Sequence, residues 1–212
     1  MDFKAGYVPG HSDSVAYLLS MMGREAGYSP EIIGRLELAA YLHDVGKIRL
    51  PDTILLAERP LSDEEFDRIK QHPRDSAAVA GGFAELEDVG PWVLHHHEHF
   101  DGSGYPDGLR AEEIPWPSRM LLVADAFQVM TTDRPYREAR TRREALHILE
   151  DKAGSQFCPH AVGLLMARDH WTPADPPLSA PPTRIWPGGD VVSPGEVMKR
   201  RDEAQRDSET HP

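Results

Sequence analysis

The segment HHHEHFDGSGYP, at residues 95–106, is the most distinctive part of this amino-acid sequence. It holds four histidines within five residues and directly follows apolar residues, which argues against a simple exposed patch of histidines. We expect a helix over residues 86–97 to lead into it. Neighbours on a helix are about 100° apart, so His96 and His97 can address one cation from adjacent directions. His96 with His99 is the other geometric option, and the spacing leaves both open.

The second half of this segment predicts an ordered loop. Gly102 and Gly104 permit backbone angles that are closed to other residues, and Pro106 stiffens the end. The stretch rich in glycine and proline continues to Pro117. We therefore expect an ordered loop over residues 100–117, with no strand beyond a short hairpin.

Outside this loop the sequence predicts one helix after another, and the expected fold class is all-α. Apolar residues recur at helical spacing, and two capping boxes, Ser62 with Glu65 and Thr141 with Glu144, mark helix starts. Ser29 followed by proline marks another start. The expected helices cover about residues 11–26, 30–46, 62–69, a segment after Pro73, 86–97, 120–130, a segment after Thr141, and 159–171.

Length and composition indicate one domain and a tail. The 212 residues suffice for a single domain of ordinary size with its own core. Residues 172–212 are rich in proline, aspartate, serine and glycine, and they show no sustained periodicity. We therefore expect one folded domain at residues 1–171 and a proline-rich C-terminal tail at residues 172–212.

Charge and cysteine content exclude several classes of protein. The formal net charge of −12 opposes binding to the backbone of DNA or RNA. A single cysteine, Cys158, excludes an internal disulfide framework. No apolar run approaches the roughly 20 residues of a membrane helix, and no secretory signal begins the chain. These features predict a cytoplasmic protein without a membrane partner, in which bound cations would offset the negative charge for a phosphate-bearing substrate.

A histidine and an aspartate stand side by side at His43-Asp44, near the end of an apolar helix. Imidazole offers one nitrogen ligand, and a carboxylate can reach two cations with its two oxygens. The alternative is a helix C-terminus that carries favourable positive charges, with Lys47 as a cap. We favour a role for Lys47 against a phosphate oxygen.

Three further residues are candidates for the same site. Asp125 lies within an apolar segment, where a buried carboxylate requires a cation or strong donors. A structural pair with an arginine is its alternative. His72 precedes a proline at a helix start and His11 opens the first helix, and for each the alternative is an ordinary surface position.

Taken in order, these motifs resemble the HD-GYP family. They are HDVGK at residues 43–47, HP at 72–73, HHExxDGxGYP at 96–106, Asp125, and RPYR at 134–137. The similarity covers about residues 11–167. It implies an HD-superfamily helical bundle in which distant imidazoles and carboxylates hold two cations.

The resemblance assigns ligands residue by residue. One cation would be held by His11, His43, Asp44 and Asp125, and the second by the bridging Asp44 with His72, His96 and His97. A third metal of some members requires a glutamate where this chain has Tyr7, so we expect two metals. Iron or manganese suits this ligand set, and zinc is also compatible with it.

The implied activity is hydrolysis of cyclic di-GMP to pGpG, and on to GMP, by metal-activated hydroxide. Asp44 and Lys47 are the expected catalytic residues. Asp101 or Glu98 is expected either to protonate the leaving group or to orient a histidine. Arg134 and Arg137 resemble positions that contact guanine and phosphate, although exposed solubilising arginines are the alternative. The expected substrate contacts are Lys47, Asp101, Gly104, Tyr105, Pro106, Arg134 and Arg137.

Two alternatives to this enzyme are kept. One is a catalytically weak sensor of cyclic dinucleotides that binds a GGDEF cyclase, and the other is a hydrolase of another nucleotide such as 3′,3′-cGAMP. Expected partners beyond the substrate are a GGDEF-domain protein, a separate response regulator, and a second copy in a homodimer. The chain departs from the family pattern at Ser76, where glycine is usual, and at Cys158, where aspartate is usual.

Overall fold

The computed structural model describes residues 10–57, 59–133 and 138–167. Within those ranges the chain is helical, apart from one isolated bridge between Ala153 and Phe157, so the predicted all-α class is confirmed. The elements are α1 (His11–Glu25), α2 (Pro30–Leu42), η1 (Val45–Arg49), α3 (Asp52–Leu55), α4 (Asp63–Ile69), α5 (His72–Ala80), η2 (Ala84–Leu86), α6 (Val89–Leu94), η3 (Ala111–Glu113), α7 (Trp116–Met130), α8 (Arg142–Asp151) and α9 (Pro159–Met166).

Side chains next to the helix starts explain where several helices begin. The Ser29 side chain accepts a hydrogen bond from the backbone of Ile32 at the start of α2. Both predicted capping boxes are formed, at Ser62 before α4 and at Thr141 before α8. Each satisfies backbone N–H groups that lack a partner inside the helix.

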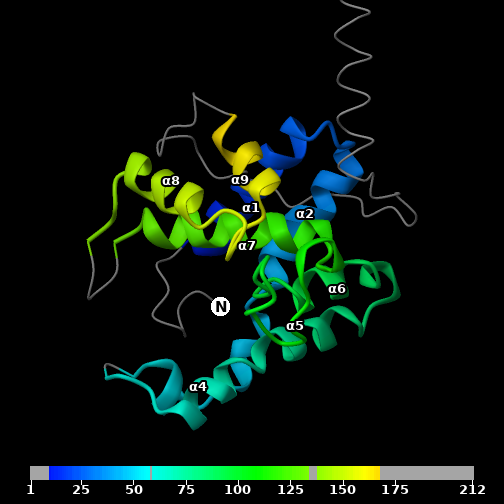
Figure 1. Ribbon diagram of the computed structural model, residues 1–212. Helices are drawn as coiled ribbons and strands as arrows, with labels where there is room; N and C mark the ends of the chain where they lie inside the picture. Colours follow the sequence, from blue (N-terminus) through cyan, green and yellow to red (C-terminus); the bar gives the residue numbers. More distant parts are fainter. Residues whose placement is uncertain (1–9, 58, 134–137, 168–212) are drawn as a thin grey trace, which may run out of the picture.

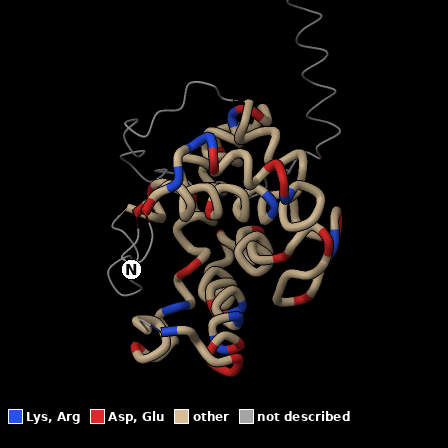
Figure 2. Tube along the Cα trace, turned by 60° about the vertical axis from the view of Figure 1, so that its left-hand side comes forward, with Lys and Arg blue, Asp and Glu red and all other residues tan. Residues whose placement is uncertain are grey.

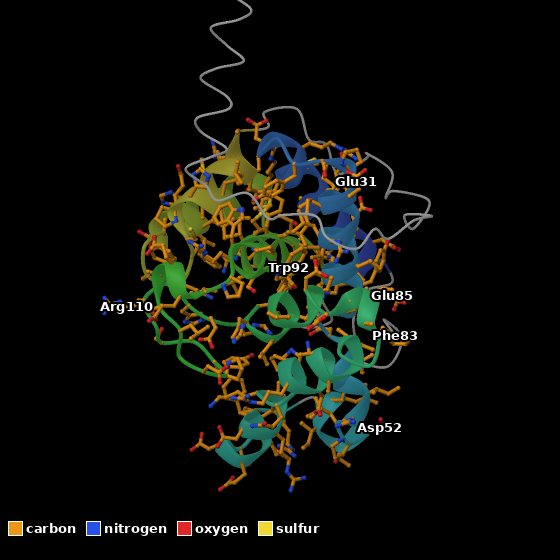
Figure 3. The ribbon with its side chains drawn as sticks, turned by 90° about the vertical axis from the view of Figure 1, so that its right-hand side faces the viewer. Glu31, Asp52, Phe83, Glu85, Trp92 and Arg110 are labelled. Atoms are coloured by element: carbon orange, nitrogen blue, oxygen red, sulfur yellow. The ribbon has the colours of Figure 1, made fainter. Side chains whose placement is uncertain are left out.

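The core lies between α1, α2, α7 and α9. α1 packs against α2, α7 and α9, and α7 also contacts α6 and α8 (Figure 1). Leu19, Leu36, Met120 and Phe127 from these helices are buried almost completely. Trp92 of α6 joins the same core and lies inside the bundle (Figure 3). The prediction that residues 120–130 form a buried helix is confirmed, and the helix begins earlier, at Trp116.

A second group of elements extends from this body. η1 packs on α5, and α5 packs on α6, while α4 lies at the far end of the molecule from α9 (Figure 1). Acidic and basic residues are interspersed over the described chain (Figure 2). In the same residues, no helix combines the length and the apolar character that crossing a bilayer requires.

Two sequence predictions about helices need correction. The helix expected over residues 86–97 is only α6, from Val89 to Leu94, and His95 to His97 follow it in a turn. At that point the backbone oxygen of Val93, which a continuing α-helix would pair with the N–H of His97, accepts a hydrogen bond from Nδ1 of His96 at 2.6 Å. Likewise, the helix expected over residues 30–46 ends at Leu42 and gives way to η1.

Other predictions concern the loop or residues that lie partly or wholly outside the described ranges. The last helix, expected over residues 159–171, is described as far as Met166. In the loop over residues 100–117 the structure shows the short helix η3 rather than a hairpin. The predicted tail at residues 172–212 lies outside the described residues, as do Tyr7, Arg134 and Arg137.

Candidate metal centre

Helix termini, the turn after α6 and one mid-helix position supply the candidate ligands. His11 is the first residue of α1, and His72 is the first residue of α5. His43 caps the C-terminus of α2, and Asp44 directly precedes η1. Asp125 lies in the middle of α7. Residues at such termini project from the ends of rigid elements, so the packing of the helices fixes their relative positions.

The structure brings these residues into two groups of potential ligand atoms. Within each group the ligand atoms lie within 4.8 Å of one another. The first group contains His11, His43 and Asp125, and the second contains Asp44, His72, His96 and His97. Of the two pairings that the spacing left open, the geometry selects His96 with His97.

The two groups adjoin each other. The imidazole rings of His43 and His96, one from each group, have centroids 5.2 Å apart. Asp44 connects them further, because Nε2 of His43 lies 3.4 Å from its Oδ2 and Nε2 of His72 lies 3.2 Å from its Oδ1. Nε2 of His11 lies 3.5 Å from Oδ1 of Asp125. The Asp44 carboxylate is therefore placed between the groups.

Hydrogen bonds at Nδ1 orient the imidazoles. Nδ1 of His43 donates to the backbone oxygen of Ala40 at 2.7 Å, and Nδ1 of His96 donates to that of Val93 at 2.6 Å. His72 is held in the same way. A carbonyl oxygen can only accept, so Nδ1 carries the proton and Nε2 presents a lone pair. This is the arrangement that orients histidine ligands in metalloproteins.

One further residue of this kind was missed from the sequence. The side-chain oxygen of Gln128 lies 2.7 Å from Nδ1 of His11 and accepts a hydrogen bond from it. Gln128 follows Asp125 by three residues on α7, and residues three apart share a helix face. That spacing was the available signal in the sequence.

Burial shapes the electrostatics of the centre. His43, His72 and His96 are each at most 1% exposed, and Nε2 of His96 has no hydrogen-bond partner. The side chains of Asp44 and Asp125 are 16% exposed, so the carboxylates mark the more open side. A buried Nε2 without a partner loses its interaction with water, and a bound cation would compensate for that loss.

Except at His43, where the nearby Asp44 outweighs burial and raises the pKa, the pKa shifts favour the forms that bind metals. Burial, followed by the charges of neighbouring histidines, holds the pKa values of His96 and His97 well below the usual histidine value. Burial opposes ionisation of Asp44, but His43 and Lys47 outweigh it and hold the pKa of that carboxyl well below its usual range. Neutral imidazoles and an ionised carboxylate are the states in which these groups coordinate a cation.

Lys47 lies beside the candidate bridging carboxylate. Its Nζ is 2.7 Å from Oδ2 of Asp44, and its side chain is largely buried. The ammonium therefore faces the centre rather than solvent. This position fits the expected role against a phosphate oxygen better than that of an exposed helix cap.

A close contact between two backbones holds the segment that carries Asp44. A Cβ atom at Gly46 would lie 2.4 Å from the backbone oxygen of His72, so only glycine fits there. The buried backbone N–H of Gly46 donates to Oγ of Ser76 at 2.8 Å. The departure from the family pattern at Ser76 thus gives this chain a hydrogen bond between η1 and α5.

The glycine-rich loop packs directly against the turn that carries His96 and His97. A Cβ atom at Gly104 would lie 2.2 Å from the backbone nitrogen of His99 and 2.5 Å from the backbone oxygen of His97. The ring of Tyr105 stacks on that of His97 with centroids 4.9 Å apart. Tyr105 therefore forms part of the wall of the centre. Arg110, further along the loop, points away from the body (Figure 3).

The roles expected for Glu98 and Asp101 stay predictions, and the structure shows what the two carboxylates contact. Oε1 of the buried Glu98 accepts hydrogen bonds from the backbone nitrogens of Asp107 and Gly108, at 2.7 and 3.1 Å. These bonds hold the loop rather than a histidine of the centre. Asp101 is exposed, and its Oδ1 accepts from the backbone of Ser103 at 2.9 Å. Both carboxylates therefore act on the conformation of the loop in this structure.

Comparison with known proteins agrees with the fold. A family model described as an HD domain matches residues 4–160. The chain belongs to the HD-domain family. The resemblance to its HD-GYP members, first seen in the sequence, is confirmed by the family model together with the curated relatives.

Several curated relatives of this HD domain are 36% identical to it. A cyclic di-GMP phosphodiesterase response regulator of Xanthomonas campestris aligns over 78% of this chain and 44% of its own length. A cyclic di-GMP phosphodiesterase of Thermotoga maritima aligns over 72% and 42%, respectively. A 3′3′-cGAMP-specific phosphodiesterase of Vibrio cholerae aligns over 70% and 35%. The chain thus spans less than half the length of these relatives.

Solved structures share the fold of this HD domain. A cyclic GMP-AMP specific phosphodiesterase of V. cholerae superposes with a TM-score of 0.62 at 20% identity, over 76% of this chain and 44% of that one. An HDGYP protein of Bdellovibrio bacteriovorus superposes with a TM-score of 0.59 at 23% identity, over 76% and 51%. At such identities the likeness shows the fold alone.

Proposed function

We propose that this HD domain hydrolyses a phosphodiester bond of a cyclic dinucleotide, with cyclic di-GMP as substrate and pGpG, then GMP, as products. The observation that carries the proposal is the convergence of two ligand groups, from residues 11 to 125, on the carboxylate of Asp44. The printed names of the curated relatives support the substrate class, because they include phosphodiesterases of cyclic di-GMP and of 3′3′-cGAMP.

The donor set fits a pair of divalent cations. We assign the first cation to His11, His43, Asp125 and one oxygen of Asp44. The second belongs to the other oxygen of Asp44 with His72, His96 and His97. Nitrogen and oxygen donors of this mixture suit iron or manganese, and zinc is a compatible third choice. When bound, two such cations would lower the pKa of a bound water and offset charge on a phosphate.

The chain's own residues would prepare the substrate for attack. Lys47, held against Asp44, is placed to donate to a non-bridging phosphate oxygen and to stabilise the charge that develops there. Tyr105, stacked on His97, closes one side of the site and limits access of water. Gly104 and Pro106 shape this wall, and Asp101 holds the turn that leads to it.

Recognition of the bases is a separate part of the proposal. Arg134 and Arg137 are assigned to guanine and phosphate because the arginine fork can read a guanine edge with two hydrogen bonds. Both lie outside the described residues. A GGDEF protein, a separate response regulator and a homodimer remain our predicted partners.

Two other functions are kept as outcomes of the test. Hydrolysis of 3′,3′-cGAMP is favoured by the names of relatives in V. cholerae. A sensor that binds the dinucleotide without cleaving it would use the same pocket with inactive chemistry. The two ligand groups make no contact that distinguishes guanine from adenine. A competition experiment between the two substrates is therefore needed to establish the preferred one.

The decisive experiment measures metals and products in the same preparation. The protein is purified without oxygen, its bound iron, manganese and zinc are determined, and cyclic di-GMP and 3′,3′-cGAMP are followed by chromatography. We expect about two metals per chain and faster cleavage of cyclic di-GMP. Full metal occupancy without cleavage of either substrate would establish the sensor instead.

Variants connect the activity to the centre. His43→Ala and Asp44→Ala should each abolish cleavage and release metal, because each removes a donor from the assigned set. His147→Ala, at an exposed position on α8, is the matched control and should keep both metal and activity. Cleavage that survives Asp44→Ala would refute the two-metal assignment.

A further inference from the structure

The geometry points to a third cation site, formed by His95, Glu98 and Asp107, which share no residue with the two groups of the metal centre. We propose that this site binds a zinc ion that fastens the turn after α6 to Asp107, in the middle of the loop over residues 100–117. One ligand atom from each residue lies within 4.8 Å of the other two. The site differs in position from the third metal of the family, which this chain lacks the glutamate to hold.

Both ring nitrogens of His95 face atoms that can only accept. Nδ1 lies 3.0 Å from the backbone oxygen of Pro91, and Nε2 lies 3.1 Å from Oδ2 of Asp107. A neutral imidazole carries one N–H, so it cannot donate to both. A positive charge between Nε2 and the carboxylate, either a second proton or a cation, resolves the conflict.

Glu98 indicates that this charge is a cation. The side chain is 1% exposed, and its Oε2 is buried without a hydrogen-bond partner. Its Oε1 already accepts from the backbone nitrogens of Asp107 and Gly108. A proton on His95 would leave Oε2 unsatisfied, whereas a cation shared by the three residues satisfies it and Nε2 together.

The distances suit a tetrahedral ion. Two ligand atoms that are each about 2.0–2.1 Å from such an ion lie roughly 3.3 Å apart, close to the 3.1 Å between Nε2 of His95 and Oδ2 of Asp107. One nitrogen and two carboxylate oxygens form a borderline donor set, which favours zinc over magnesium or calcium. A water molecule would complete the coordination on the exposed side of Asp107.

Arg74 defines the charge of the site. Its guanidinium lies 2.5 Å from Oδ1 of Asp107, on the carboxylate oxygen that does not face His95. It thereby turns Oδ2 toward the imidazole, but its positive charge also opposes a cation. The two carboxylates and one guanidinium leave a net negative site, so binding remains favourable and is weaker than it would be without Arg74.

The test counts zinc ions rather than turnover. Metal-free protein is titrated with zinc alone against a chromophoric chelator. We expect the wild type to bind three equivalents. Asp107→Asn should bind two with unchanged affinity, and its affinity for the third should fall at least tenfold. Asp67→Asn, an exposed carboxylate on α4, is the control and should retain three. Two equivalents for the wild type, or an unchanged third equivalent in Asp107→Asn, would overturn the proposal.

Two more variants separate this site from its surroundings. Arg74→Gln should tighten the third equivalent several-fold, because it removes a nearby positive charge, whereas a proton on His95 predicts no change in zinc affinity. Asp44→Ala should lose metal from the main centre and still bind zinc at the third site. The third equivalent therefore tests this inference even where the proposed hydrolysis fails. Circular dichroism of each variant confirms that it is folded.

Discussion

At the scale of single residues, Lys47 is the side chain whose role the geometry defines most narrowly. Its Nζ contacts Asp44 at 2.7 Å, yet an ammonium group is no metal ligand. We therefore expect Lys47→Ala to lower the turnover number about 10²–10³-fold, as loss of a preorganised donor does, while bound metal is unchanged. Metal analysis and single-turnover kinetics on one preparation measure both. Release of metal by Lys47→Ala would show that the lysine supports the ligands instead.

Gly104 offers a second prediction at this scale. The atoms that a new Cβ would meet at 2.2 and 2.5 Å belong to the backbone of His99 and His97, so no side-chain rotation can relieve the clash. Gly104→Ala should displace the loop and reduce turnover, measured with cyclic di-GMP as substrate. Gly163→Ala, where nothing lies within 4 Å, is the control and should stabilise α9 by about 0.5–1 kcal/mol. Wild-type kinetics in Gly104→Ala would show that the loop adapts.

At the scale of elements, the contact between η1 and α5 depends on the hydroxyl of Ser76, which accepts a hydrogen bond from the backbone N–H of Gly46. Without it the buried N–H of Gly46 has no acceptor, which costs about 1–3 kcal/mol. Ser76→Ala should lower the free energy of unfolding by this amount in urea denaturation, and Ser76→Gly should do so as well. Ser155→Ala, an exposed hydroxyl, should change it by less than about 0.5 kcal/mol. Equal stabilities for the variants at both positions would rule out the proposed contact.

The helix boundaries show which features of the fold can be predicted from the sequence. Periodicity and capping boxes predicted the helices around Ser62 and Thr141 because local hydrogen bonds fix those starts. The end of α6 was predicted wrongly: the helix stops at Leu94, and the turn that follows is joined to the loop where the backbone oxygen of His97 accepts from Tyr105, eight residues further along the chain. Local patterns contain no signal for such a contact.

The same limit applied to the candidate site. The family resemblance named the candidate ligands, including His96 and His97, whereas helical spacing alone left His97 and His99 open. The turn after α6 brings His97 into the second group. Packing between elements revealed the contribution of Ser76, since its partner lies 30 residues away. That the selected residues bind metal remains a prediction.

At the scale of the whole molecule, the metal-free protein should lose stability as pH falls below about 6.5. Burial lowers the pKa values of His11, His96 and His97 in the folded state, so the unfolded chain binds more protons below its histidine pKa of about 6.5. At His43 the nearby Asp44 outweighs burial and raises the pKa, which opposes the trend at one residue only. Thermal unfolding of chelator-treated protein at about pH 7.5 and about pH 5.5 tests this.

We expect the lower unfolding midpoint at the acidic pH, and an equal or higher one would contradict the balance of shifts. Added manganese provides the matched comparison at the neutral pH. A ligand that binds only the folded state at a hundred times its dissociation constant stabilises by about 2.7 kcal/mol. The midpoint of wild-type protein should therefore rise with manganese, while that of Asp44→Ala should not.

The spread of the candidate ligands along the chain has a consequence for biosynthesis. The donors begin at His11 and end at Asp125, so a nascent polypeptide that stops short of α7 lacks part of the first group. Ion uptake into the first position must then come late, after most of the domain has left the ribosome and closed, whereas the second group is complete by His97. Loading of the first position would thus report that the polypeptide has matured, and a product truncated before α7 would lack it.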